Sequence, residues 1–174
     1  YKLVRCLHFR RVLYPCLRFV QCASEPLGFY ADQTWMASVG APSARWQLVW
    51  NTVRDARDAA IDFLRTRVSA GTPVKGADAD DAARGVIEAA GFGKFFTHRT
   101  GHSIDARAIH GSGPNLDNLE TRDDRVLIPG VGFSIEPGIY LRNEFGVRSE
   151  VNIHIGDRTL LITPQEIQHD LIIL

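Results

Sequence analysis

Residues 133–155, FSIEPGIYLRNEFGVRSEVNIHI, carry the most informative spacing in the chain. Two segments rich in β-branched residues flank the polar stretch LRNEFG, which is typical of a β-hairpin. The midpoint of Glu136 and Glu150 is Asn143, so a hairpin centred there makes the glutamates cross-strand neighbours, with Cβ atoms about 4.5 to 5.5 Å apart. Like charges so placed are destabilising, and a divalent cation between them would remove the penalty. The spacing predicts a metal site; the alternative is a solvated face on which Arg148 screens the acids.

A second stretch, FFTHRTGHSID at residues 95–105, places His98 and His102 four positions apart. Its phenylalanines favour a strand, and its threonines and Gly101 are poor helix formers, so we expect a strand rather than a metal-binding helix. On one strand face the two histidines would be about 13 Å apart, from a rise of roughly 3.3 Å per residue, too far to bind one ion. Gly101 lets a neighbouring strand approach His102 closely, which makes His102 the better ligand candidate. A hydrogen-bonded strand histidine is the alternative.

The rest of the chain predicts an α+β fold with an antiparallel sheet. A strand is expected over residues 28–40, and its alternation places Asp32 on one face with Thr34. Apolar residues recur at helical spacing over 43–68, and a second helix is expected over 78–90. Several short strands with hairpin-like spacing follow. Asp32 is the third candidate ligand, although a lone acid there could equally be an edge residue.

Charge and composition argue against several classes of function. The 174 residues suit one domain, and 20 basic residues balance 20 acidic ones, which gives no sign of a nucleic-acid or membrane partner. No run of eighteen apolar residues predicts a transmembrane helix, and no signal peptide is recognisable, so we expect a cytoplasmic protein.

Residues 1–27 form an atypical basic segment. The first 24 residues contain five basic residues, no acid and all three cysteines, whose spacings fit neither a metal cluster nor a disulfide framework. We interpret the segment as non-native or out-of-frame sequence, with a transit peptide as the alternative. The native fold is expected to occupy residues 28–174.

Read in order, ADQT (31–34), HRTGHSI (98–104), FSIEPGIYL (133–141) and GVRSEV (146–151) resemble the pita-bread metallopeptidases. This family includes Xaa-Pro aminopeptidase, prolidase, methionine aminopeptidase and creatinase, and the sequence resembles the Xaa-Pro branch most. The resemblance implies that 28–174 is the C-terminal part of the catalytic domain, a partial pita-bread fold whose curved antiparallel sheet has helices on one face.

The resemblance also implies a site for two divalent ions, manganese or alternatively cobalt or zinc. The metal ligands carried over by motif are Asp32, His102, Glu136 and Glu150. His98 and His110 match histidines that line the pocket and act in catalysis, and Arg148 matches a residue that braces the bridging glutamate. Tyr140 and Thr34 match positions around the substrate pocket. The implied substrate is a peptide with proline after the cleaved bond, and the implied assembly is a homodimer.

Three departures from the family pattern keep other functions open. No aspartate precedes Asp32, and Gln21 stands eleven residues upstream, where the first metal aspartate is expected. Gly111 follows His110 where many relatives have an acid. The α/β half of the domain that precedes this part in the family is absent, so we expect the isolated chain to be unstable or to aggregate. The alternatives are a non-catalytic module that binds peptide or protein, and a creatinase-like C–N hydrolase.

Overall fold

The computed structural model describes residues 8–12, 16–23 and 30–174. Two helices, α1 (Ala44–Ser69) and α2 (Gly76–Ala89), and the short 3-10 helix η1 (Gly93–Phe95) lie between an N-terminal and a C-terminal group of strands. The first group is β1 (His8–Val12), β2 (Cys16–Ala23) and β3 (Ala31–Ser38). The second is β4 (Ser103–Ile104), β5 (Gly132–Ile135), β6 (Gly138–Leu141), β7 (Phe145–Arg148), β8 (Val151–Ile155), β9 (Leu160–Thr163) and β10 (Ile172–Ile173).

Both helices form where the sequence predicts them. Ser43 caps α1, because its hydroxyl oxygen accepts a hydrogen bond from the backbone nitrogen of Trp46 at 3.2 Å. Gly71 and Gly91 follow the two helices with positive φ angles of 66° and 81°, a conformation that glycine adopts at little cost. The apolar stripe of α1 is buried against the strands, and the described residues include no helix that could cross a membrane.

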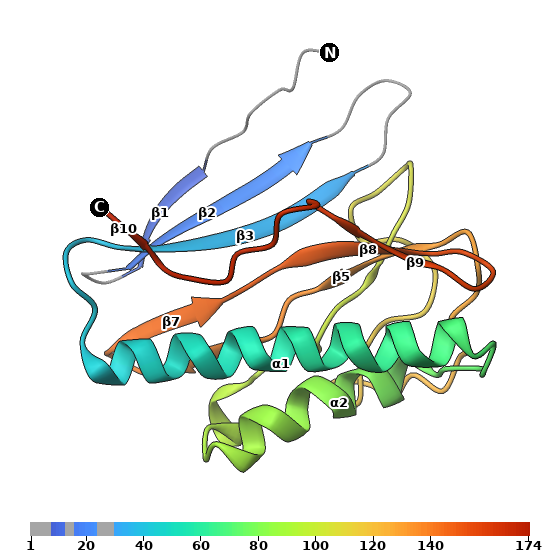
Figure 1. Cartoon of the computed structure of the whole chain (residues 1–174), viewed down its shortest axis with the longest axis horizontal. Coiled ribbons are helices and arrows are strands. Elements are labelled where there is room, and N and C mark those ends of the chain that lie inside the picture. Colours follow the sequence, from blue (N-terminus) through green and yellow to red (C-terminus); the bar gives the residue numbers. More distant parts are fainter. Residues whose placement is uncertain (1–7, 13–15, 24–29) are drawn as a thin grey trace.

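The strands form two four-stranded sheets and one separate hairpin. One sheet has the order β1-β2-β3-β10, the other β4-β5-β8-β9, and β6 pairs with β7. A bridge between Thr34 and Glu150 joins the first sheet to the connection between β7 and β8. Figure 1 shows α1 and α2 on the same side of the strands, as the predicted α+β architecture requires. Among the strands of the described residues, all pairs are antiparallel except β3 with β10, which run parallel.

The hairpin register matches the prediction. Ile135 pairs with Val151 on one side, and Gly138 pairs with Arg148 on the other. The same register continues between these pairs, so Glu136 lies opposite Glu150. Asn143 occupies the turn with φ of 61°, a left-handed conformation that asparagine tolerates better than most residues.

The strand expected over residues 95–105 is largely wrong. Phe95 ends η1, residues 96–100 belong to neither helix nor strand, and only Ser103–Ile104 form a strand. Side chains of α2 hydrogen-bond the carbonyl oxygens of Phe96 and His98 and the backbone nitrogen of Thr100. The Thr100 carbonyl oxygen instead accepts from the backbone nitrogen of Glu136, directly after β5. The estimate of 13 Å between His98 and His102 therefore does not apply, whereas the prediction that they do not share a helix is confirmed.

Candidate active site

Glu136 and Glu150 lie opposite each other, between the part of the hairpin where β5 pairs with β8 and the part where β6 pairs with β7. Pro137 interrupts the strand between β5 and β6 because proline cannot donate to the ladder. Both glutamates are buried, with exposed fractions of 8% and 1%. Arg148 lies between them and forms ion pairs with Glu136 Oε2 at 2.7 Å and with Glu150 Oε2 at 2.9 Å. The arginine thus screens both acids, as the alternative interpretation expected, but the face that carries them is buried and not solvated.

Thr34 ties β3 to this pair of acids. Its hydroxyl donates to Glu150 Oε2 at 2.6 Å and accepts from Arg148 Nη2 at 2.8 Å. The backbone nitrogen of Glu150 also donates to the carbonyl oxygen of Thr34. These contacts bring the strand that carries Asp32 against the hairpin that carries the glutamates.

His102 presents a buried nitrogen to two carboxylates. Its Nδ1 lies 3.0 Å from the carbonyl oxygen of Ser103, an acceptor, so Nδ1 carries the proton and Nε2 has the lone pair. Nε2 makes no hydrogen bond among the described residues and lies 3.4 Å from Glu136 Oε1 and 3.9 Å from Asp32 Oδ2. Burial lowers the pKa of His102, which favours this neutral form.

This donor set fits a cation. A lone pair facing two carboxylate oxygens across 3.4 and 3.9 Å gains nothing from either, whereas a cation between them would be attracted to all three. With ligand bonds of about 2.0 to 2.2 Å, an ion could reach His102 Nε2 and one carboxylate oxygen at a time across these separations. Within the described ranges, no cluster of three His, Cys, Asp or Glu side chains is already closed to metal-binding distances. The donor side chains would therefore have to draw together, and Arg148 would have to yield part of its contact with the glutamates.

Two residues that the sequence analysis did not single out hydrogen-bond the backbone of Asp32 and His102 and the side chain of Glu136. The Asn152 side chain accepts from the backbone nitrogen of Asp32 at 2.9 Å and donates to the carbonyl oxygen of Asp32 at 2.6 Å. The Ser134 hydroxyl accepts from the backbone nitrogen of His102 at 3.0 Å and donates to Glu136 Oε1 at 3.3 Å. Each lies two positions from a predicted ligand on a strand, so alternation was the signal that could have identified both.

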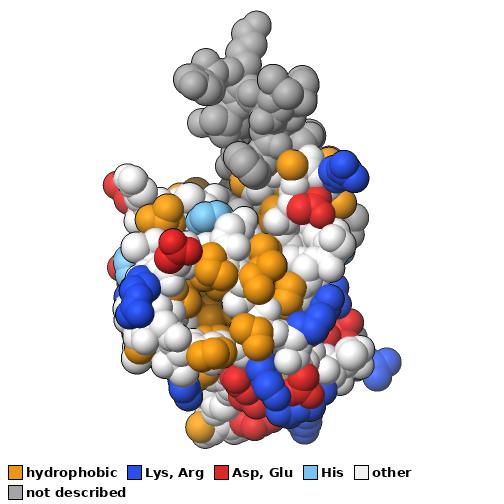
Figure 2. Space-filling view, turned by 90° about the vertical axis from the view of Figure 1, so that its right-hand side faces the viewer, with side chains coloured by type: hydrophobic (Ala, Val, Ile, Leu, Met, Phe, Trp, Pro, Cys, Tyr) orange, Lys and Arg blue, Asp and Glu red, His pale blue; other side chains and the backbone are white. Residues whose placement is uncertain are grey.

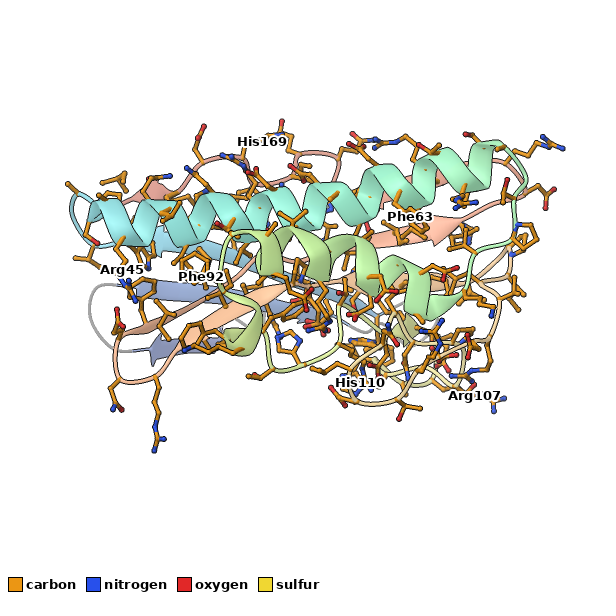
Figure 3. All side chains as sticks on the ribbon, turned by 90° about the horizontal axis from the view of Figure 1, so that it is seen from below. Arg45, Phe63, Phe92, Arg107, His110 and His169 are labelled. Atoms are coloured by element: carbon orange, nitrogen blue, oxygen red, sulfur yellow. The ribbon has the colours of Figure 1, made fainter. Side chains whose placement is uncertain are left out.

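The two predicted pocket histidines differ in their surroundings. His98 is partly buried, with Nδ1 2.7 Å from the carbonyl oxygen of Arg99 and Nε2 2.8 Å from the Tyr140 hydroxyl. Burial lowers the pKa of His98. His110 is exposed, and its ring centroid lies 4.2 Å from that of His102. Figure 3 shows His110 on the loop side of the molecule, away from α1.

The position expected for the first aspartate lies on β2. There Gln21 pairs with Gln33, and Cys22 pairs with Asp32. No residue of β2 is an acid, so among the described residues the strand beside Asp32 supplies no carboxylate.

Comparison of the sequence with protein-family models identifies the family of this chain. The model of metallopeptidase family M24 matches residues 16–157. The chain belongs to metallopeptidase family M24. The match includes β2, which lies within the segment interpreted as atypical, and it extends through β8.

Curated M24 relatives and solved structures cover most of this chain. The probable dipeptidase PepE of Mycobacterium tuberculosis is 33% identical over 147 residues, which are 84% of this chain and 36% of that protein. The Xaa-Pro dipeptidase of Lactobacillus helveticus is 33% identical over 71% of this chain and 30% of its own length. The crystal structure of the X-Pro aminopeptidase from Thermotoga maritima superposes with a TM-score of 0.79 and 28% identity, over 91% of this chain and 42% of that one. The chain therefore spans about a third of the length of these curated relatives, and the superposition confirms the pita-bread fold.

Proposed function

We propose that this chain is the metal-binding part of a peptidase that cleaves Xaa-Pro bonds. The observation that carries the proposal is the position of His102 Nε2, which is buried, makes no hydrogen bond among the described residues and faces carboxylate oxygens of Asp32 and Glu136. Relatives named Xaa-Pro dipeptidase and X-Pro aminopeptidase support the substrate class. A cytoplasmic location and a homodimer belong to the same proposal.

The proposed ligands are Asp32, His102, Glu136 and Glu150, for two divalent ions of manganese, cobalt or zinc. Bound ions would supply Lewis-acid activation of the scissile carbonyl and a water of lowered pKa. Since β2 offers no acid beside Asp32, one of the two positions would bind its ion more weakly.

The remaining residues of the site would bind the substrate, transfer protons and orient the metal ligands. His98 keeps its proton on Nδ1 against the Arg99 carbonyl, and its Nε2 meets the Tyr140 hydroxyl, an arrangement suited to proton transfer through either group. Arg148 would orient Glu136 and Glu150 through its two ion pairs. His110 lies beside the His102 ring, where it could contact a substrate group.

Metal binding and hydrolysis test the proposal separately. Titration calorimetry with Mn²⁺ should show saturable binding to the 174-residue protein, weakened in Glu150→Gln and unchanged in the exposed control Glu166→Gln. With Mn²⁺ present, an Xaa-Pro dipeptide should be hydrolysed faster than Ala-Ala, and Glu150→Gln should lower kcat/KM by about 100-fold or more. Equal Mn²⁺ binding by the two variants would refute the ligand assignment.

A peptide-binding module without catalysis is the second candidate. The lack of an acid on β2 favours it, because a two-metal hydrolase needs both positions filled. Fluorescence polarisation with a labelled Xaa-Pro peptide would then show binding that is the same with Mn²⁺ and with EDTA, together with no hydrolysis.

A further inference from the structure

An ion pair on α2 lies buried behind the candidate active site. Asp80 and Arg84 are one helical turn apart, with exposed fractions of 0% and 9%. Arg84 Nε donates to Asp80 Oδ2 at 2.7 Å, and Arg84 Nη2 donates to Asp80 Oδ1 at 3.0 Å. Neither residue lies in a motif that the sequence analysis singled out.

Apart from one hydrogen bond that Asp80 Oδ2 accepts from the backbone nitrogen of Asn118 at 3.2 Å, the pair directs its remaining hydrogen bonds to the segment of residues 96–100. Asp80 Oδ1 accepts from the backbone nitrogen of Thr100 at 2.8 Å and from its hydroxyl at 2.6 Å. Arg84 donates from Nη1 to the carbonyl oxygen of Phe96 at 3.1 Å and from Nη2 to that of His98 at 2.9 Å. The guanidinium also lies over the Phe96 ring, 4.2 Å from its centroid.

The hydrogen bonds from Asp80 and Arg84 take the place of those that a neighbouring strand would supply to residues 96–100. Residues 96–100 belong to no helix or strand, so their polar groups need partners from elsewhere if they are to be buried. The pair supplies them on both sides of His98: two carbonyls at or before it, and one amide two residues after it.

The same segment contacts a predicted metal ligand. The carbonyl oxygen of Thr100 accepts from the backbone nitrogen of Glu136 at 2.7 Å. The chain of contacts therefore runs from Asp80 through Thr100 to Glu136, while Arg84 fixes the backbone that carries His98.

We propose that Asp80 and Arg84 are a positioning pair, which sets His98 and Glu136 in their places relative to each other without touching substrate. The inference rests on the proposed function for the roles of His98 and Glu136, but the positioning itself is a property of the chain alone. Stability does not by itself account for such a pair, because buried ion pairs are often no better for stability than apolar residues of similar volume.

Three variants test the proposal. Arg84→Lys keeps the charge but lacks the planar fork that reaches two carbonyls and a carboxylate together. Asp80→Asn keeps the shape and removes the charge. Ile87→Ala, at a fully buried position on the same helix, is the control for lost packing, because the Ile87 side chain cannot hydrogen-bond residues 96–100.

The first measurement is amide hydrogen exchange in the 174-residue protein without metal. Under conditions where global unfolding is matched by urea titration, Arg84→Lys and Asp80→Asn should exchange the amides of Thr100 and Glu136 on the order of tenfold faster than Ile87→Ala does. The His98 imidazole resonances should shift in the first two variants and stay in place in the control. Equal exchange in all three would overturn the proposal, and should Asp80→Asn fail to fold, Arg84→Lys alone decides it.

The second measurement separates this inference from the proposed function. In protein that hydrolyses an Xaa-Pro dipeptide with Mn²⁺, Arg84→Lys should lower kcat by about tenfold or more with a smaller change in KM, because it displaces groups placed for the transition state. A kcat equal to that of Ile87→Ala would count against positioning. If the wild-type chain hydrolyses nothing, the proposed function fails, while the exchange result still decides the positioning role.

Discussion

Arg148 is the residue whose contacts bear most directly on metal binding. It pairs with both Glu136 and Glu150, so it compensates the like charges that the hairpin register brings together. We expect Arg148→Gln to lower the free energy of unfolding by about 3 to 5 kcal/mol, because it leaves two buried carboxylates without their cation. Mn²⁺ should recover part of that loss, so its effect on Tm should be larger in the variant than in the wild type. Thermal denaturation with and without Mn²⁺ measures both effects.

Arg142, exposed in the turn of the same hairpin, supplies the control for Arg148. Arg142→Gln removes the same charge from the same hairpin without touching the glutamates. An equal Mn²⁺ effect on Tm in both variants would show that Arg148 and a metal ion do not compete for these acids.

His98 links stability to pH. Burial lowers its pKa in the folded protein, so below the ordinary histidine pKa of about 6.5 the unfolded chain binds the proton more readily. Stability contributed by neutral His98 is thus complete above that pH and declines as pH falls toward the folded-state pKa. His98→Gln should flatten the decline in urea-unfolding free energy between about pH 7 and pH 5. A decline as steep in His98→Gln as in the exposed control His169→Gln would contradict this.

The sequence could predict that Glu136 lies opposite Glu150 because a turn fixes the register of a hairpin, and the turn at Asn143 is local. It could not predict that residues 96–100 avoid a strand. Their partners, Asp80 and Arg84, lie on a helix, and helix periodicity makes those two residues an ordinary i,i+4 pair. Nothing in the spacing shows that both are buried with hydrogen bonds directed to another segment.

At the scale of single elements, the Gln168 side chain hydrogen-bonds the backbone of strand β3. The Gln168 amide accepts from the backbone nitrogen of Met36 at 2.7 Å and donates to its carbonyl oxygen at 2.6 Å, as a neighbouring strand would. Arg57, fully buried on α1, donates to the carbonyl oxygen of Gln168 at 2.8 Å and holds this connection in place.

We expect Gln168→Leu to destabilise the protein by about 1 to 3 kcal/mol, because it leaves the polar groups of Met36 buried without these hydrogen bonds. Urea unfolding measures the loss. Gln165→Leu, at an exposed position three residues earlier, is the matched control. If the two variants were equally stable, the side chain would not replace a strand in this sheet.

The molecule as a whole leaves apolar surface exposed. A groove of about 880 Å³ opens between β3, β4, β5 and β8, and its lining includes Ile104, Ile128 and Val131. Figure 2 shows hydrophobic side chains gathered around a hollow on one face of the molecule. Ile128 is 54% exposed. Exposed apolar surface of this kind favours self-association. If the 174-residue chain aggregates, as the sequence analysis expects, we expect the contacts to form at this groove.

Self-association should therefore depend on the groove. We expect the weight-average mass of the 174-residue protein in sedimentation velocity to rise with concentration, and Ile128→Glu to reduce that rise because a charge at the groove opposes apolar contact. Leu48→Glu is the control, since Leu48 is 55% exposed on α1 and does not line the groove. An equal reduction in both variants would assign the effect to net charge, and no rise in the wild type would show that the groove does not drive association.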